Sequence, residues 1–190
     1  MAKKNEFKPD KPYSGFWGKL LLTRQQRRNV LKWTLYSLVM LFLSVAQDVM
    51  LSRVRIFGAT TELVPCGIFL VCLLEGTESG CIFALVASVV YLFTGSAAGV
   101  YSIVFITALA VGAAALRQSY LQKGFGAAML CTSLAVLVYE LATFCICAFL
   151  GLTTIGRIGV AFVTAVLTIL AIPAVYFVLK AIGGGDAWKE

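Results

Sequence analysis

The chain has 190 residues, of which 60% are apolar and 13% are charged, and its formal net charge is +7 at pH 7. Charged residues make up about 25% of an ordinary soluble domain. Eleven of the 25 charged residues lie within the first 32 positions, so the rest of the chain is nearly uncharged. A soluble domain cannot bury so much apolar surface and still cover itself with polar groups. The composition excludes a soluble enzyme, a nucleic-acid-binding domain and a disordered protein, and it predicts an all-α polytopic membrane protein.

The chain also lacks the side chains that most catalytic and metal sites use. It contains no histidine, which is the usual general base and the commonest metal ligand. Its six cysteines lie inside apolar runs without the spacing of a metal site, and we interpret them as small, buried hydrophobic residues. The sequence therefore predicts a protein that is not an enzyme and that has no cofactor.

A membrane-spanning helix needs about 20 mostly apolar residues. The second and third apolar runs are short, and the 12 residues of the second would cover only about 18 Å as a helix. We expect a basic cytoplasmic or interfacial segment (1–29), a membrane domain (30–180) and a cytoplasmic tail (181–190). The six predicted membrane segments are 30–51, 63–74, 80–93, 97–116, 125–150 and 158–179.

The distribution of basic residues predicts the orientation of these segments. The first 32 residues hold nine of the 16 lysines and arginines. With six segments, Arg117, Lys123, Lys180 and Lys189 fall on the same side as this basic end, which is the cytoplasmic side by the positive-inside rule. Both termini are therefore expected in the cytoplasm.

The basic N-terminal segment carries a second pattern. On a helix over residues 15–28, Phe16, Trp17, Leu20 and Leu21 would share one face, away from most of the basic residues. Such a helix would lie on an anionic inner leaflet. The alternative is a flexible basic tail that only sets the orientation, and neither interpretation implies binding to nucleic acid.

Small residues recur every four positions through the third predicted segment, at Gly76, Gly80, Ala84 and Ser88. Gly112 is a comparable small residue in the fourth segment. Small side chains let two helix backbones approach closely, and such packing holds helices together in lipid. We expect most of these contacts to lie within the chain and the remainder to be available to a partner protein.

Two acidic residues lie inside predicted membrane segments. Glu140 is near the middle of the fifth segment, where an ionisable group is costly and suggests a functional role. We favour a neutral, hydrogen-bonded packing residue over a proton or cation relay, because no second carboxylate follows Glu140 at helical spacing. Asp48 is near the outer end of the first segment, where Arg53 or Arg55 would form an ion pair with it.

The stretch from Gln47 to Leu116 resembles the MreD family of bacterial rod-shape proteins, and the resemblance extends over about residues 33–180. The family pattern has an outer turn, an acidic residue that opens a short helix, and then a glycine-rich helix, a turn and a fourth helix. The chain departs from the family at Tyr91 or its neighbours, where members usually have an aspartate, and at Ala84 and Ser88, where they have glycine. The matching residues are Ile56-Phe57-Gly58, Glu62-Leu63-Val64, Glu75-Gly76, Gly80, Gly95, Gly99-Val100-Tyr101 and Gly112.

The resemblance implies a scaffold in the bacterial cytoplasmic membrane that has no enzymatic activity. It would bind an MreC-like membrane protein and support cell shape and peptidoglycan synthesis by the elongation machinery. The further partners that it implies are a RodA-type glycosyltransferase and a class B penicillin-binding protein.

A second class of protein has the same length and number of helices. Vitamin-binding S components of energy-coupling-factor transporters also have six helices, with polar and aromatic side chains around a vitamin near the outer surface. Glu140, Tyr139 and Tyr101 are the residues that would contribute here. The first segment, however, has large residues on every face instead of the Ala-x-x-x-Ala stripe that docks such subunits.

Overall fold

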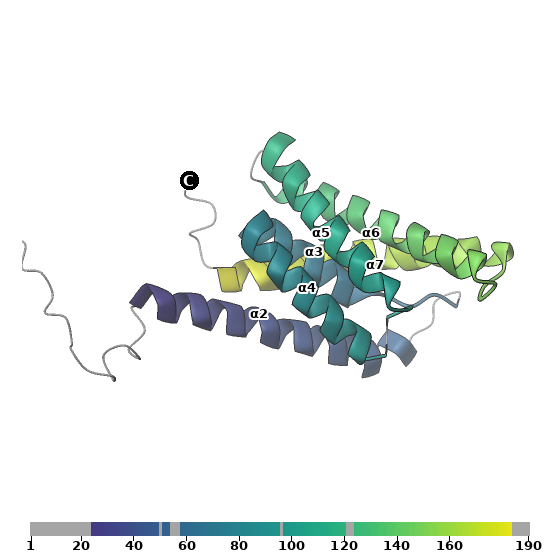
Figure 1. Cartoon of the computed structure of the whole chain (residues 1–190), viewed down its shortest axis with the longest axis horizontal. Coiled ribbons are helices and arrows are strands. Elements are labelled where there is room, and N and C mark those ends of the chain that lie inside the picture. The colour runs from purple at the N-terminus through teal and green to yellow at the C-terminus, as the bar shows by residue number, and fades with distance from the viewer. Residues whose placement is uncertain (1–23, 50, 54–57, 96, 121–123, 184–190) are drawn as a thin grey trace, which may run out of the picture.

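The computed structural model describes residues 24–49, 51–53, 58–95, 97–120 and 124–183. The predicted all-α class is confirmed, and each of the six predicted segments corresponds to one α-helix (Figure 1). Most of the segment 15–28, together with Ile56 and Phe57, lies outside the described residues. The elements are α2 (Arg24–Val49), η1 (Leu51–Arg53), α3 (Leu63–Glu75), α4 (Thr77–Phe93), α5 (Tyr101–Tyr120), α6 (Phe125–Phe149), η2 (Ile155–Arg157) and α7 (Ile158–Gly183).

Four of these helices, α2, α5, α6 and α7, are long and apolar enough to cross a membrane, and the protein is a multi-pass membrane protein on this basis. The short helices are α3 and α4, as the sequence predicts. Helix α2 begins at Arg24, six residues before the apolar run that starts at Val30. Its first turns consist of polar residues, which a water-facing end of a long helix tolerates.

Helix α3 is the centre of the bundle. Its residues from Leu63 to Leu73 are all buried, and it contacts α2, α4, α5, α6 and α7. A helix that is apolar on every face needs neighbours on every face. Figure 1 shows α3 enclosed between α2, α4 and the longer helices behind them. The short second segment is therefore a buried core helix with little contact with lipid.

A single glycine joins α3 to α4. Gly76 has φ of +90°, a conformation that strains any residue with a Cβ atom, and it lets the chain reverse between Glu75 and Thr77. The two helices stay close together beyond this turn. At Gly80 they are so close that a Cβ atom would lie 2.8 Å from the Cα atom of Cys72. The small residue at position 80 therefore allows α4 to pack directly against the backbone of α3.

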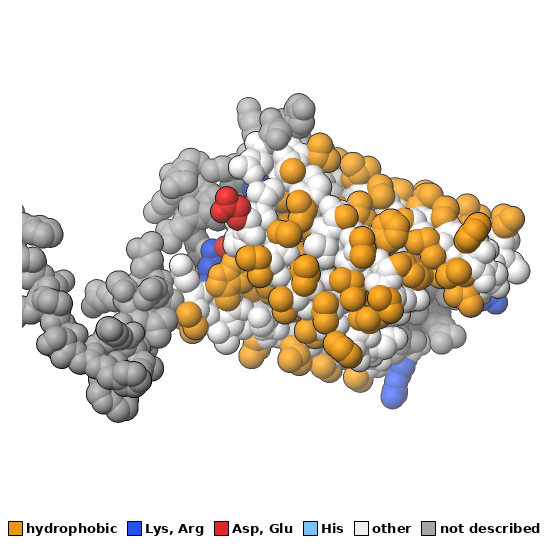
Figure 2. Space-filling model, in the orientation of Figure 1, with side chains coloured by type: hydrophobic (Ala, Val, Ile, Leu, Met, Phe, Trp, Pro, Cys, Tyr) orange, Lys and Arg blue, Asp and Glu red, His pale blue; other side chains and the backbone are white. Residues whose placement is uncertain are grey.

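The outside of the bundle suits a lipid environment. Figure 2 shows apolar side chains along the visible face, whereas the charged side chains seen there lie toward its two ends. Large apolar residues with most of their surface exposed, such as Phe93, Phe149 and Leu170, would be unfavourable in water. The six cysteines are free, and Cys66, Cys72 and Cys131 are buried, but Cys145 is exposed on the apolar surface, so the interpretation of all six as buried residues is wrong at that position.

Candidate functional site

The N-terminus of α3 lies deep inside the bundle. The backbone N–H of Glu62 donates a hydrogen bond to Thr168 of α7 at 3.1 Å. Thr168 is ten residues from the start of α7, which corresponds to about 15 Å along that helix. Figure 1 shows that α6 and α7 extend beyond the other helices at this end of the molecule. The first turn of α3 is therefore surrounded by protein, well below the ends of its longest neighbours.

A helix that begins at this depth has backbone N–H groups that no water reaches. Two side chains from other helices satisfy two of the N–H groups at this start. The Oγ1 atom of Thr168 accepts the bond from Glu62, and Oε1 of Gln47 in α2 accepts a hydrogen bond from the N–H of Val64 at 3.0 Å. Pro65, in the same turn, has no N–H to satisfy. Helices α2 and α7 therefore cap α3 from outside.

These caps belong to a larger group of polar residues, which we name the polar cluster and define as Gln47, Glu62, Tyr91, Glu140 and Thr168. The Tyr91 hydroxyl donates to Oε2 of Glu62, and Nε2 of Gln47 donates to the Tyr91 hydroxyl, both at 3.5 Å. These distances are at the long limit for a hydrogen bond, so both contacts are weak. The polar cluster gathers residues from α2, α4, α6, α7 and the start of α3.

Glu140 of α6 is the most buried acidic residue of the polar cluster, with 8% of its surface exposed. Among the described residues its Oε1 atom has no hydrogen-bond partner, and no lysine or arginine forms an ion pair with it. Its charge interacts with that of Glu62, which approaches from the start of α3. The hydrogen-bonded state that the sequence favours for Glu140 therefore lacks a partner for this oxygen atom.

The opposite, C-terminal end of α3 contacts two basic side chains. Lys32 Nζ forms an ion pair with Glu75 Oε2 at 2.7 Å, and the Tyr36 hydroxyl donates to Glu75 Oε1 at the same distance. Arg117 of α5 donates to the backbone carbonyl of Leu73. A cation at the carbonyl end of a helix is stabilised by the helix dipole. Arg117 and Lys32 therefore fix this end of α3 against α5 and α2.

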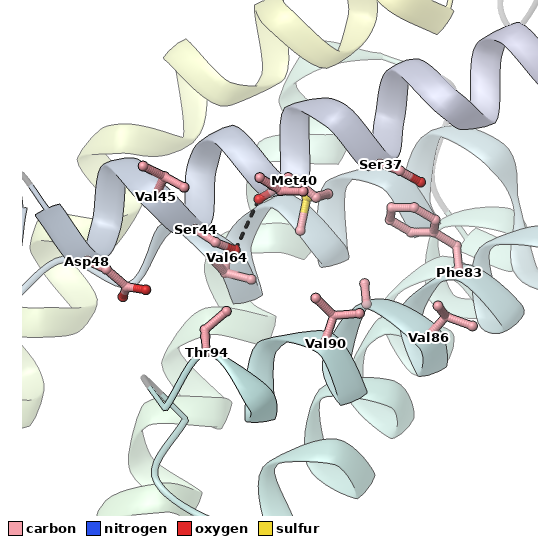
Figure 3. A pocket seen from close by; sticks show the side chains of 12 residues that line it. Ser37, Met40, Ser44, Val45, Asp48, Val64, Phe83, Val86, Val90 and Thr94 are labelled. Carbon is pink, nitrogen blue, oxygen red and sulfur yellow. Dashed lines mark hydrogen bonds between the residues drawn. The ribbon is translucent and has the colours of Figure 1, made fainter.

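A groove lies between α2 and α4 on the lipid-facing side of the bundle, and we name it the lateral groove. Its volume is about 290 Å³. Figure 3 shows its two walls, with Met40 and Ser44 on α2 and Phe83 and Val90 on α4. It is lined by Ser37, Met40, Leu41, Ser44, Val45, Asp48, Val64, Phe83, Val86, Ala87, Val90 and Thr94.

Asp48, which is predicted to form an ion pair with an arginine, lies at the end of this groove near Thr94 (Figure 3). Both Asp48 and Arg53 are exposed, and Arg55 lies outside the described residues. The pairing stays a prediction. Asp48 directly follows the buried Gln47 in the chain. The two side chains differ in exposure because consecutive residues of a helix face different directions.

The small residues of the sequence pattern have different positions in the fold. Gly80, Ala84 and Ser88 are buried on one face of α4, and the Ser88 hydroxyl lies 3.4 Å from that of Thr107 on α5. Gly112 is exposed on α5, and nothing lies within 4 Å of the position of a Cβ atom there. Gly76 and Gly95 have positive φ angles in the turns at either end of α4, and Gly99 lies under the ring of Tyr101.

Four residues of the polar cluster were not predicted as site residues from the sequence: Gln47, Glu62, Tyr91 and Thr168. Their positions are far apart along the chain, and helical spacing only relates residues of one helix. The signal that was available is the acidic residue directly before an apolar run, at Glu62-Leu63-Val64-Pro65.

No group of three or more histidine, cysteine or acidic residues within the described part of the chain could hold a metal ion. Comparison of the chain with protein-family models, with curated proteins and with solved structures finds no match. The functional argument therefore depends on the lateral groove, the polar cluster and the sequence pattern.

Proposed function

We propose that the chain is a scaffold without enzymatic activity in the bacterial cytoplasmic membrane, and that it supports cell shape and peptidoglycan synthesis as an MreD-type subunit. In this proposal all six helices are membrane segments and both termini are cytoplasmic. The excess of basic residues on the side of Lys32, Arg117 and Lys180 supports this orientation. The resemblance of about residues 33–180 to the MreD family supports the assignment to this class.

The observation that carries the proposal is the lateral groove. Its α2 wall runs from Ser37 to Asp48, which is three helical turns or about 17 Å. Three turns accommodate the side chains that one face of a partner helix presents at helical spacing. Most of the lining side chains are apolar, and the small residues Ser44 and Ala87 allow close approach. The occupant that fits is one transmembrane helix of an MreC-like protein.

Co-purification in mild detergent with a tagged MreC-like partner tests this assignment. Ala87→Trp and Val90→Trp would fill the groove from its α4 wall, and we expect each to reduce recovery of the partner about tenfold, which corresponds to about 1.4 kcal/mol. Leu170→Trp is the matched control, because Leu170 is exposed on α7 and does not line the groove. Folded groove variants that recover the partner as well as the wild type would contradict the proposed docking site.

The implied neighbours beyond the first partner are a RodA-type glycosyltransferase and a class B penicillin-binding protein. Anionic lipid of the inner leaflet is the proposed partner of the basic segment that precedes α2. Recovery of both enzymes through the MreC-like protein, and its loss in the groove variants, would place the chain in the elongation machinery.

A vitamin-binding S component remains the second candidate, and the polar cluster is the observation that favours it. Glu62, Tyr91 and Glu140 meet in the outer half of the bundle under the proposed orientation. The same purification separates the two functions. An MreC-like protein without a retained vitamin supports the scaffold, whereas a retained vitamin together with an ATPase module supports the transporter subunit.

A further inference from the structure

The two carboxylates of the polar cluster come from segments far apart in the chain, and they lie close enough near the start of α3 for their charges to interact. Glu62 precedes the first turn of α3, and Glu140 reaches it from α6. The positive end of the α3 dipole stabilises one negative charge at this place. It does not compensate a second one, and two like charges at close range in a medium of low polarity repel strongly.

Among the residues that the structure describes, no lysine or arginine forms an ion pair with Glu62 or Glu140. The titratable groups that interact with Glu140 are Glu62, Tyr91 from α4 and Tyr139 from α6 itself. Tyr101 from α5 interacts with Glu62. Helices α2 and α7 contribute the neutral side chains of Gln47 and Thr168. Within the described part of the chain, the second carboxylate therefore has only neutral groups around it besides Glu62.

A second observation points to a ligand. Glu140 is more than nine-tenths buried, and its charge interacts with that of Glu62. Its Oε1 atom has no hydrogen-bond partner among the described residues. A buried carboxylate without a partner is costly. A proton or a bound cation would remove that cost, and the oxygen atoms of Glu62 and Tyr91 in the same cluster are ligands that suit a hard cation.

We propose that Glu62 and Glu140 form a binding site for one monovalent cation, either a proton or an alkali metal ion, at the buried start of α3. The site requires both carboxylates, because Glu62 supplies one charge at the α3 N-terminus and Glu140 supplies the second from α6. The inference does not depend on the proposed scaffold function, since neither residue lines the lateral groove.

Thermal unfolding of the detergent-purified full chain tests the site and distinguishes the two cations. At fixed pH and ionic strength, replacing N-methylglucamine chloride with sodium or potassium chloride raises the Tm if the occupant is an alkali ion. With the ions held constant, raising the pH from 6 to 9 lowers the Tm if the occupant is a proton, because the proton leaves. A cation at ten times its dissociation constant shifts the Tm by about 3–6 °C.

The variants assign the effect to the pair. Glu140→Gln and, independently, Glu62→Gln are expected to lose the dependence on cation or pH, so the inference stays testable if one of them does not fold. Glu78→Gln is the matched control, because Glu78 is an exposed acidic residue in the first turn of α4. It is expected to keep the wild-type dependence.

Infrared difference spectroscopy provides a direct readout for the proton. A carbonyl band of a protonated carboxyl group that is present in the wild type, and absent in Glu140→Gln or Glu62→Gln, would identify a bound proton. The inference is overturned if the wild-type Tm depends on neither cation nor pH, or if the folded glutamine variants retain the full dependence.

Discussion

The side-chain oxygen of Gln47 accepts a hydrogen bond from the backbone N–H of Val64 at 3.0 Å, so that one helix caps another inside the bundle. Gln47 is buried, with 8% of its surface exposed. Water is therefore not available to replace the bond, and the free N–H would remain unsatisfied if the side chain were lost. This bond connects the position of α2 to the start of the central helix.

Replacement of Gln47 by leucine tests the importance of this cap. We expect Gln47→Leu to lower the free energy of unfolding by about 1–3 kcal/mol, the cost of leaving one buried polar group unsatisfied. Gln47→Glu keeps an acceptor oxygen and serves as the comparison. Denaturation in detergent, followed by circular dichroism, measures both. An unchanged midpoint for Gln47→Leu would mean that another group satisfies the Val64 N–H.

The packing of α4 on α3 makes a second prediction. Gly80→Ala would place a Cβ atom 2.8 Å from the Cα atom of Cys72, and a backbone atom cannot move aside cheaply. We expect a loss of about 1–3 kcal/mol of stability, typical of overpacking. Gly80→Leu and Ala84→Leu are expected to disrupt assembly, measured as loss of the monodisperse peak in detergent chromatography.

Gly112→Ala is the matched control for Gly80→Ala. Gly112 is also a helical glycine, but nothing lies within 4 Å of the position of its Cβ atom. The higher helix propensity of alanine should leave stability equal or raise it by up to about 1 kcal/mol in this control. Equal effects at the two positions would show that α3 and α4 do not pack as closely as the structure places them.

The positions of the six helices could be predicted from the sequence, but the way in which they pack against one another could not. Mostly apolar runs mark each of the six helices, and Gly76 marks the turn between α3 and α4. The spacing of these runs along the sequence does not show that α3 is enclosed on every side, since a short apolar run is equally consistent with a tilted membrane span. The length of α3 was the only signal, because about 20 Å is too short for the ~30 Å hydrocarbon core.

The polar cluster was harder to predict for a related physical reason. Glu140 was recognisable because an acidic residue inside an apolar run is costly. Its partner Glu62 is 78 positions away and precedes a different helix, so no periodicity connects the two. Gln47 and Thr168 are common residues in membrane helices, and only the depth at which α3 begins gives them a capping role.

The proposed orientation makes a prediction about labelling in cells. In a variant without native cysteines, single cysteines at Ile56 and Thr154 should react with a membrane-impermeant maleimide added from outside. Cysteines within the first 25 residues and at Gln122 should react only after the cells are opened. Removing the native residues is necessary because Cys145 is exposed on α6. Labelling of Gln122 from outside would contradict the six-segment arrangement.

The last prediction concerns the stability of variants at Glu140. Glu140→Gln keeps the shape of the side chain and removes its charge, so it should fold with stability close to that of the wild type at neutral pH. Glu140→Leu removes the unpartnered oxygen atom altogether. Its cost should not exceed about 1 kcal/mol, the usual size of a hydrogen-bond contribution inside a membrane protein.

The comparison between the two variants separates a neutral Glu140 from a paired anion. If Glu140 were the counterion of a buried cation, both variants would strand that cation and lose about 3–5 kcal/mol. Arg53 and Arg157, the cations available at this end within the described residues, are both exposed, and water solvates them without Glu140. Small, similar changes in the unfolding midpoint are therefore expected for Gln and Leu. A Glu140→Gln protein that folds normally but no longer recovers the MreC-like partner would instead identify Glu140 as a residue of the partner interface.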